Sequence, residues 1–155
     1  MPVLKSNDPV YNVNLAYQIA GELFNNPILA RLAAAQAILE SGLDSRPSKL
    51  AVTYSNLFGI KGQGDLGSIA MPTTEYVEGK ARACTASFAW NSSVEKSFQQ
   101  YHDLLSKGTS DNPDRYRNLW SVTDFNNAAE LIVTDGYATD PNYTKELIRV
   151  DKRYA

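Results

Sequence analysis

Glu40 is the residue of this chain whose surroundings most clearly predict chemistry. It ends an apolar, alanine-rich run that begins at Pro27, and Ser41 and Gly42 follow it at once. The helix dipole disfavours an anion at the C-terminal end of a helix, and apolar neighbours disfavour it as well. Both effects predict a raised pKa for Glu40. A carboxylic acid that stays protonated near neutral pH is what a general acid for glycosidic cleavage requires.

The hydrophobic pattern predicts the helices that precede and carry this residue. Apolar residues recur every fourth position over Asn12–Phe24 and indicate a first helix. Asn26 and Pro27 fit the cap and the first position of a second helix, which ends near Ser41. Residues 43–67 indicate loop and short helical turns.

The pattern changes after Ser68. Thr73–Val77 and Ala81–Trp90 resemble two strands around a tight turn at Glu78-Gly79-Lys80. Three further helices are predicted: one from a capping box at Ser92 and Glu95 to Gly108, one from Asp124 to Gly136, and one that opens at Asp140-Pro141. The order of elements predicts one α+β domain over residues 1–155, mostly helical, with a small hairpin lobe beside the helix that ends in Glu40. Such an arrangement makes a cleft between the two lobes.

Composition excludes several classes of function. The net charge of −2 gives no reason to expect nucleic acid, and no segment approaches the about 20 apolar residues of a membrane span. Cys84 is the only cysteine and His102 the only histidine, so neither a disulfide, a metal site nor a cofactor is expected. We expect Cys84 to be a packed thiol within a strand and His102 to be exposed on an outer helix face.

Five short segments recur in an order that resembles a known family. They are Ala37–Gly42, Ser48–Ala51, Asn56–Gly62, Thr74–Tyr76 and Gly136–Tyr143. The set is similar to glycoside hydrolase family 73, the peptidoglycan-cleaving glucosaminidases, over about residues 12–150. The resemblance implies a lysozyme-like fold and hydrolysis of the β-1,4 bond between N-acetylglucosamine and N-acetylmuramic acid.

The resemblance also implies roles for residues of these motifs. Glu40 would be the general acid, Glu75 the base or an orienting carboxylate, and Tyr137 a further catalytic residue. The substrate-binding residues expected from the motifs and from helical spacing are Gln36, Asn56, Phe58, Tyr76, Thr139 and Tyr143.

Two positions depart from the family pattern. Leu43-Asp44 stand where Trp-Gly is common, and Phe88–Asn91 lacks the basic residue of Phe-Arg-x-Tyr. Both departures concern how the sugars are bound, and neither concerns the acid.

Less specific alternatives exist for each of these residues. Glu75 could be a solvated hairpin carboxylate, Tyr137 a hydrophobic cap, and Asn56 and Phe58 structural residues of the loop and core. We expect Asp44 and Asp140 to be turn and cap residues.

Two other functions remain open. A lytic transglycosylase would use a single Glu and give 1,6-anhydro products, and an inactive glycan-binding module would keep the fold without the chemistry. The expected partner is the glycan strand of peptidoglycan, bound by a monomer.

The site of action follows from the resemblance. It implies action on the bacterial cell wall, in the periplasm or outside the cell. Because Met1–Asp8 lacks the pattern of a signal peptide, delivery by phage lysis or a secretion apparatus is expected.

Overall fold

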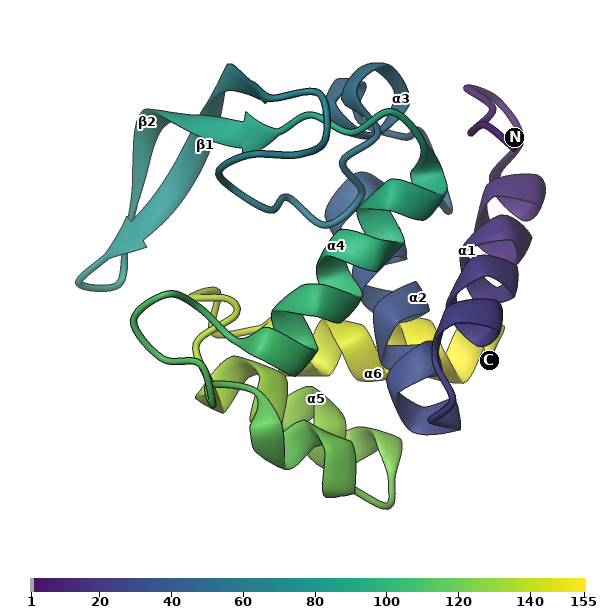
Figure 1. The fold of residues 1–155 in the computed structure, drawn as a ribbon, viewed down its shortest axis with the longest axis vertical. Helices are drawn as coiled ribbons and strands as arrows, with labels where there is room; N and C mark the ends of the chain where they lie inside the picture. Colours follow the sequence, from purple (N-terminus) through teal and green to yellow (C-terminus); the bar gives the residue numbers. More distant parts are fainter. Residues whose placement is uncertain (1) are drawn as a thin grey trace.

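The computed structural model describes residues 2–155, and it consists of a helical body from which a two-stranded hairpin projects (Figure 1). The elements in chain order are α1 (Pro9–Leu23), α2 (Pro27–Ser41), α3 (Lys49–Tyr54), β1 (Ser68–Val77), β2 (Lys80–Ala89), α4 (Val94–Lys107), the 3₁₀ helix η1 (Arg117–Ser121), α5 (Phe125–Thr134) and α6 (Tyr143–Tyr154). The hairpin lies on the side of the molecule away from both chain ends (Figure 1). The predicted mostly helical α+β architecture is confirmed.

Helix α2 forms the centre of the helical body. Asn26 caps it by accepting hydrogen bonds from the amides of Ile28 and Leu29, as its position predicts. The helix packs against α1, α5 and α6, and its residues from Leu32 to Ile38 are all buried. A helix that is apolar on most sides is enclosed by others, and the five alanines of α2 allow close approach. The end of α2 is therefore fixed by tertiary packing.

The hairpin is joined to the helical body mainly at its base. β1 and β2 pair antiparallel, with Glu75 opposite Arg82 and Val77 opposite Lys80. The turn has two residues, Glu78 and Gly79, both with positive φ, so Lys80 belongs to the strand and not to the turn. The strands pair with each other and make few contacts with the helices.

One loop connects the hairpin base to the end of α2. The Asn56 side-chain amide donates hydrogen bonds to the carbonyls of Ile60 and Ala89 at 2.9 Å each. It also accepts from the amides of Phe58 and Ile60. This buried asparagine therefore holds the Asn56–Gly62 loop against β2.

Several predicted boundaries shift. α1 begins at Pro9 with Asp8 as its cap, and α6 begins at Tyr143 rather than at Asp140-Pro141. The predicted capping box is wrong by one residue. Ser93 caps α4 by accepting from the Lys96 amide, whereas the Ser92 hydroxyl donates to Asp65.

Two side chains are placed differently from expectation. His102 is half-buried, with its ring 4.8 Å from Phe24 and 5.5 Å from Trp120 between centroids, because the neighbouring elements cover this face of α4. Cys84 is only half-buried, because the hairpin has no second layer over it.

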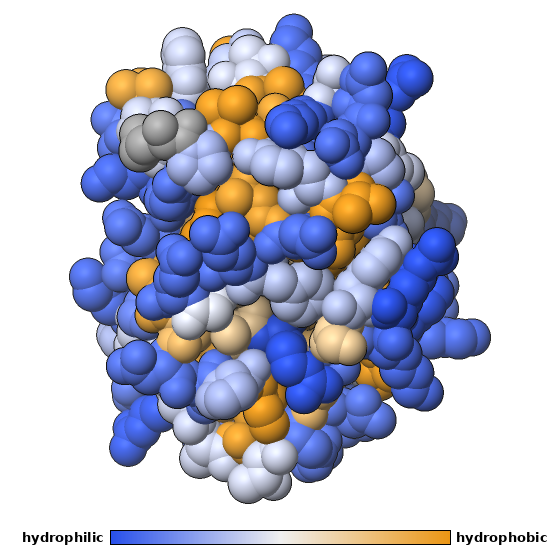
Figure 2. Space-filling model, turned by 90° about the vertical axis from the view of Figure 1, so that its right-hand side faces the viewer, coloured by the Kyte–Doolittle hydropathy of each residue, from blue (hydrophilic) through white to orange (hydrophobic). Residues whose placement is uncertain are grey.

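The face that carries α1 is mostly hydrophilic, and polar groups interrupt the apolar ones in its upper half (Figure 2). Single exposed apolar residues of this kind are ordinary for a protein surface. Among residues 2–155, no helix combines the length and apolarity needed to cross a bilayer.

Candidate active site

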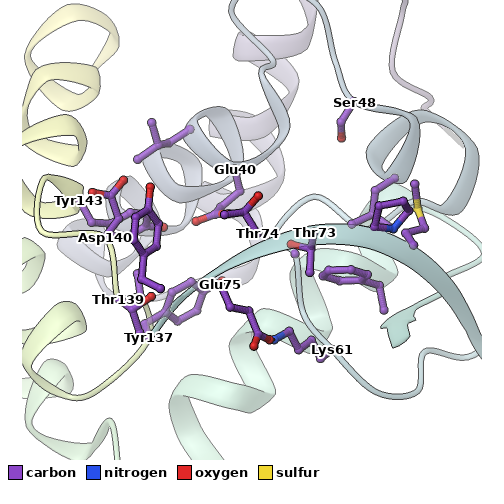
Figure 3. A pocket seen from close by; sticks show the side chains of 18 of the residues that line it. Glu40, Ser48, Lys61, Thr73, Thr74, Glu75, Tyr137, Thr139, Asp140 and Tyr143 are labelled. Carbon is purple, nitrogen blue, oxygen red and sulfur yellow. The ribbon is translucent and has the colours of Figure 1, made fainter. Parts of the chain in front are cut away.

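A cleft of about 770 Å³ separates the helical body from the hairpin. Figure 3 shows Glu40 between the loop 137–143 and the part of β1 that carries Thr73, Thr74 and Glu75. The walls of the cleft come from the end of α2, the start of α3, β1, and the segment that leads into α6. Residues far apart in the chain therefore meet around one carboxyl group.

The last turn of α2 sets the position of Glu40. Gly42 ends the helix in the left-handed conformation, and its amide donates to the Ile38 carbonyl. Ser41 is buried, and its hydroxyl donates to the Leu57 carbonyl at 2.5 Å. The Ser-Gly pair after Glu40 thus fixes the helix end to the loop that also holds the hairpin.

The surroundings of Glu40 favour its protonated form. Glu40 is exposed to the open cleft, and the groups that line the cleft lie around it. Desolvation is the main reason that its pKa is raised. The charge of Asp140 raises the pKa further, and a hydrogen bond with Tyr143 opposes the rise. The shift has the predicted direction, with desolvation as its main cause.

Gly59 brings backbone close to this carboxyl group. Its φ is +66°, and a Cβ at this position would lie 3.6 Å from Oε2 of Glu40. A side chain here would strain the backbone and occupy space next to the acid. Gly59 therefore shapes the floor of the cleft.

Glu75 lies across the cleft on β1 and is paired with a lysine. Its Oε1 is 2.6 Å from the Lys61 ammonium, and both side chains are about half exposed. The hydrogen bond from Lys61 and then its charge lower the pKa of Glu75. In Figure 3 the Glu75 carboxylate turns toward Lys61. Glu75 is therefore ionised at neutral pH, whereas Glu40 is biased toward the acid form.

Four other predicted residues line the cleft: Tyr76, Tyr137, Thr139 and Tyr143. Tyr137 donates its hydroxyl to the Phe58 carbonyl at 3.1 Å, so the loop 137–143 is tied to the Asn56–Gly62 loop. Tyr143 is buried except for its edge on the cleft. Its hydroxyl accepts a hydrogen bond from Gln36 and lies close enough to Glu40 for each group to affect the pKa of the other. Tyr76 is 40% exposed near the hairpin tip.

Three residues predicted to bind substrate lie in the interior instead. Gln36 is fully enclosed, and Asn56 and Phe58 are only 2% exposed. None of the three lines the cleft. The expectation that these residues contact a sugar is therefore corrected, and they support the cleft from beneath. Asn56 holds the loop, Phe58 packs against Tyr101, and Gln36 hydrogen bonds to Tyr143.

The cleft residues that the sequence did not single out include Lys61, Gly59 and Asp140. Lys61 and Gly59 belong to the Asn56–Gly62 motif, which was the available signal. Asp140 was assigned to a cap, and its carboxylate does accept from the Asn142 amide at 2.9 Å, but it also lies on the cleft close enough to affect Glu40. Among residues 2–155, no group of three or more His, Cys, Asp or Glu side chains is arranged to hold a metal ion.

Comparison with known proteins places this cleft in a family. Residues 16–155 match the glucosaminidase family, described as mannosyl-glycoprotein endo-β-N-acetylglucosaminidase. The chain is 35% identical to the exo-glucosaminidase LytG of Bacillus subtilis over 82% of the chain and 44% of that protein. It is 33% identical to the peptidoglycan hydrolase FlgJ of Escherichia coli K12 over 87% of the chain and 42% of that protein. The chain thus spans less than half the length of these relatives.

Solved structures agree with the sequence comparison. The catalytic domain of the autolysin Auto from Listeria monocytogenes superposes with a TM-score of 0.79 at 28% identity, covering 97% of this chain and 88% of that one. A glycoside hydrolase domain of FlgJ from Salmonella typhimurium gives 0.64 at 29% identity, covering 96% and 97%. The lysozyme-like fold that the motifs implied is therefore confirmed, and the chain belongs to the glucosaminidase family of glycoside hydrolases, family 73.

Proposed function

We propose that this domain hydrolyses the glycan strands of peptidoglycan at the β-1,4 bond between N-acetylglucosamine and N-acetylmuramic acid. The observation that carries the proposal is Glu40, a carboxyl group with a raised pKa on the floor of a cleft of about 770 Å³. The names of the relatives support a wall substrate, since they include a peptidoglycan hydrolase and an autolysin. Such a substrate implies action outside the cytoplasm.

Glu40 serves as the general acid in this proposal. Its protonated form donates to the glycosidic oxygen as the bond to the anomeric carbon breaks, and the departing sugar leaves as a neutral alcohol. Tyr137, Thr139, Tyr143 and Tyr76 bind the sugars along the cleft walls. Their rings and hydroxyls offer stacking surfaces and hydrogen bonds of the kind that sugars use.

Glu75 serves as the second carboxylate, as a base or as an orienting and electrostatic group. It is ionised, as a base must be, but in the observed arrangement it is turned toward Lys61. A hairpin joined mainly at its base can move toward bound sugar and change this arrangement. The 2-acetamido group of the substrate is the other candidate nucleophile, with Glu75 orienting it.

The products distinguish this function from its alternatives. Purified peptidoglycan is digested and reduced with borohydride, and the sugar alcohol at the new chain ends is identified. We expect N-acetylglucosaminitol. N-acetylmuramitol would indicate a muramidase, 1,6-anhydro ends a lytic transglycosylase, and no new ends a binding module, and each of these three results would contradict the proposed bond.

A further inference from the structure

A buried chain of hydrogen bonds runs from the core to Tyr143, whose hydroxyl lies near Glu40. The Tyr101 hydroxyl donates to Oε1 of Gln36, and Nε2 of Gln36 donates to the Tyr143 hydroxyl at 3.0 Å. Tyr143 and Glu40 both line the cleft, where the Tyr143 hydroxyl lies close enough to the carboxyl group of Glu40 to lower its pKa. Three separate elements, α4, α2 and α6, contribute to this chain.

Burial makes the chain directional. Gln36 and Tyr101 have no accessible surface, and Tyr143 is only 5% exposed, so each polar group depends on the other members for its partners. With its oxygen toward Tyr101, the Gln36 amide presents its NH₂ group to Tyr143. The Tyr143 oxygen then accepts from Gln36, which leaves the Tyr143 hydrogen to be donated to Glu40.

We propose that Gln36, held by Tyr101, is a positioning residue that directs the Tyr143 hydroxyl hydrogen to one oxygen of Glu40. The other oxygen is thereby left to carry the proton that is transferred to the leaving group. The catalytic part of this inference rests on the proposed function of Glu40 as the acid. The hydrogen-bond part concerns the protein alone and can be measured without substrate.

The neighbours of Glu40 determine what loss of the chain would do. Tyr143 faces it from α6, and Asp140 and Tyr137 face it from the preceding loop. The other charged residues that line the cleft are Lys49, Lys61, Glu75 and Glu146. Among the groups acting on Glu40, the hydrogen bond of Tyr143 lowers its pKa, while desolvation and Asp140 raise it. Weakening the Tyr143 bond therefore moves the pKa of Glu40 upward.

Carbon-13 NMR titration of the Glu40 carboxyl group, assigned with Glu40→Gln, measures this directly in the free protein. Tyr143→Phe removes the donor, and Gln36→Met removes the amide that orients it at similar side-chain volume. Each variant should raise the titration midpoint of Glu40, by about one pH unit for the loss of one hydrogen bond to a charged group. The double variant should titrate like Tyr143→Phe alone, because both changes act through one bond.

Tyr154→Phe is the matched control. Its hydroxyl donates to Asp44 at 3.0 Å, so this variant also removes a tyrosine–carboxylate hydrogen bond, but at a site that does not line the cleft. The Glu40 midpoint should not move. Tyr101→Phe offers a milder test should Gln36→Met fail to fold, since it removes only one hydroxyl. It should raise the midpoint in the same direction.

The outcomes separate the two proposals. Tyr143→Phe could raise the Glu40 midpoint while Gln36→Met or Tyr101→Phe leaves it unchanged, as the Tyr154→Phe control should. Tyr143 would then act alone, and the role of Gln36 would be overturned. Additive shifts in the double variant would overturn it too. A wild-type protein that titrates as expected but releases no sugar ends would contradict the proposed function and leave the chain intact. In an active enzyme, the alkaline limb of the pH–rate profile should follow the NMR midpoint.

Discussion

Lys61 and Glu75, which both line the cleft, form an ion pair of 2.6 Å between the loop after α3 and strand β1. The pair therefore connects the Asn56–Gly62 loop, which holds the hairpin base, with a carboxylate on the hairpin itself. Both side chains are about half exposed, so the pair adds little to stability. Its effect is on the charge and direction of Glu75, which it keeps ionised and turned to one side.

Glu75→Gln should therefore lose most of the activity while binding of wall fragments is largely kept. Lys61→Gln should act differently. Without its lysine the pKa of Glu75 rises toward the ordinary value, so the acidic limb of the pH–rate profile moves to higher pH. Lys107→Gln, which removes a surface lysine 3.9 Å from Asp103 on α4, is the matched control. All three variants should keep the thermal midpoint of the wild type.

Azide gives a second test of Glu75. Turnover of Glu75→Ala with added azide should yield a glycosyl azide if Glu75 lies beside the anomeric carbon. Wild-type rates in Glu75→Gln would remove this residue from the site.

The pH–rate profile should be bell-shaped, with activity highest at mildly acidic to neutral pH. The alkaline limb reports ionisation of Glu40, whose pKa is raised, and the acidic limb reports protonation of Glu75, whose pKa is lowered. His102 packs against Phe24 and Trp120 and does not line the cleft. His102→Gln should consequently leave the alkaline limb in place, and a limb that moved with this variant would mean that Glu40 is not the titrating acid.

Gly59→Ala should impair both folding and activity. A non-glycine residue at φ +66° costs roughly 1–2 kcal/mol, and the new methyl group would lie next to the Glu40 carboxylate. Gly79→Ala, at φ +78° with no atoms within 4 Å, has similar backbone strain at the hairpin turn without the contact. Chemical unfolding should show comparable losses in both variants. Only Gly59→Ala should lose activity beyond its loss of folded protein, and equal activities would argue that Gly59 has no role at the acid.

Much of this structure could be predicted from local sequence signals. Asn26, Gly42 and Asp124 bound their helices as expected, because capping depends on a few adjacent residues. Glu40 could be placed at a helix end for the same reason. The predicted start of α4 is wrong by one residue, since Ser92 and Ser93 both fit a cap. Only the contact of Ser92 with Asp65 shows which of the two serines caps the helix.

The support beneath the site could not be predicted in this way. Gln36 lies one turn before Glu40, which suggested a shared surface facing the substrate. Which element covers that surface depends on Tyr101 and Tyr143, 65 and 107 residues away in the chain. Such contacts follow from tertiary packing, so a polar residue beside the acid was read as a ligand when it is a buried support.

The thermal stability of Glu40→Gln should depend on pH in a defined direction. The folded pKa of Glu40 is raised above its unfolded value, so its contribution to stability is complete at acid pH and is lost as pH rises through the folded pKa. An amide carries no charge to desolvate. The variant should match the wild type at acid pH and melt at a higher temperature at neutral to alkaline pH, in unfolding followed by circular dichroism. If Glu40→Gln instead melted at a lower temperature than the wild type at every pH, desolvation of the Glu40 charge would carry no cost in stability.

The most direct test of the account is the rate at which wild type and Glu40→Gln release reducing ends from purified peptidoglycan. The amide is nearly isosteric with the acid but cannot donate a proton to the leaving oxygen. General acid catalysis contributes about 10²–10⁴-fold, so the folded variant should retain at most about 1% of the wild-type rate. A folded Glu40→Gln protein that keeps more than about a tenth of that rate would contradict the assignment of Glu40 as the acid.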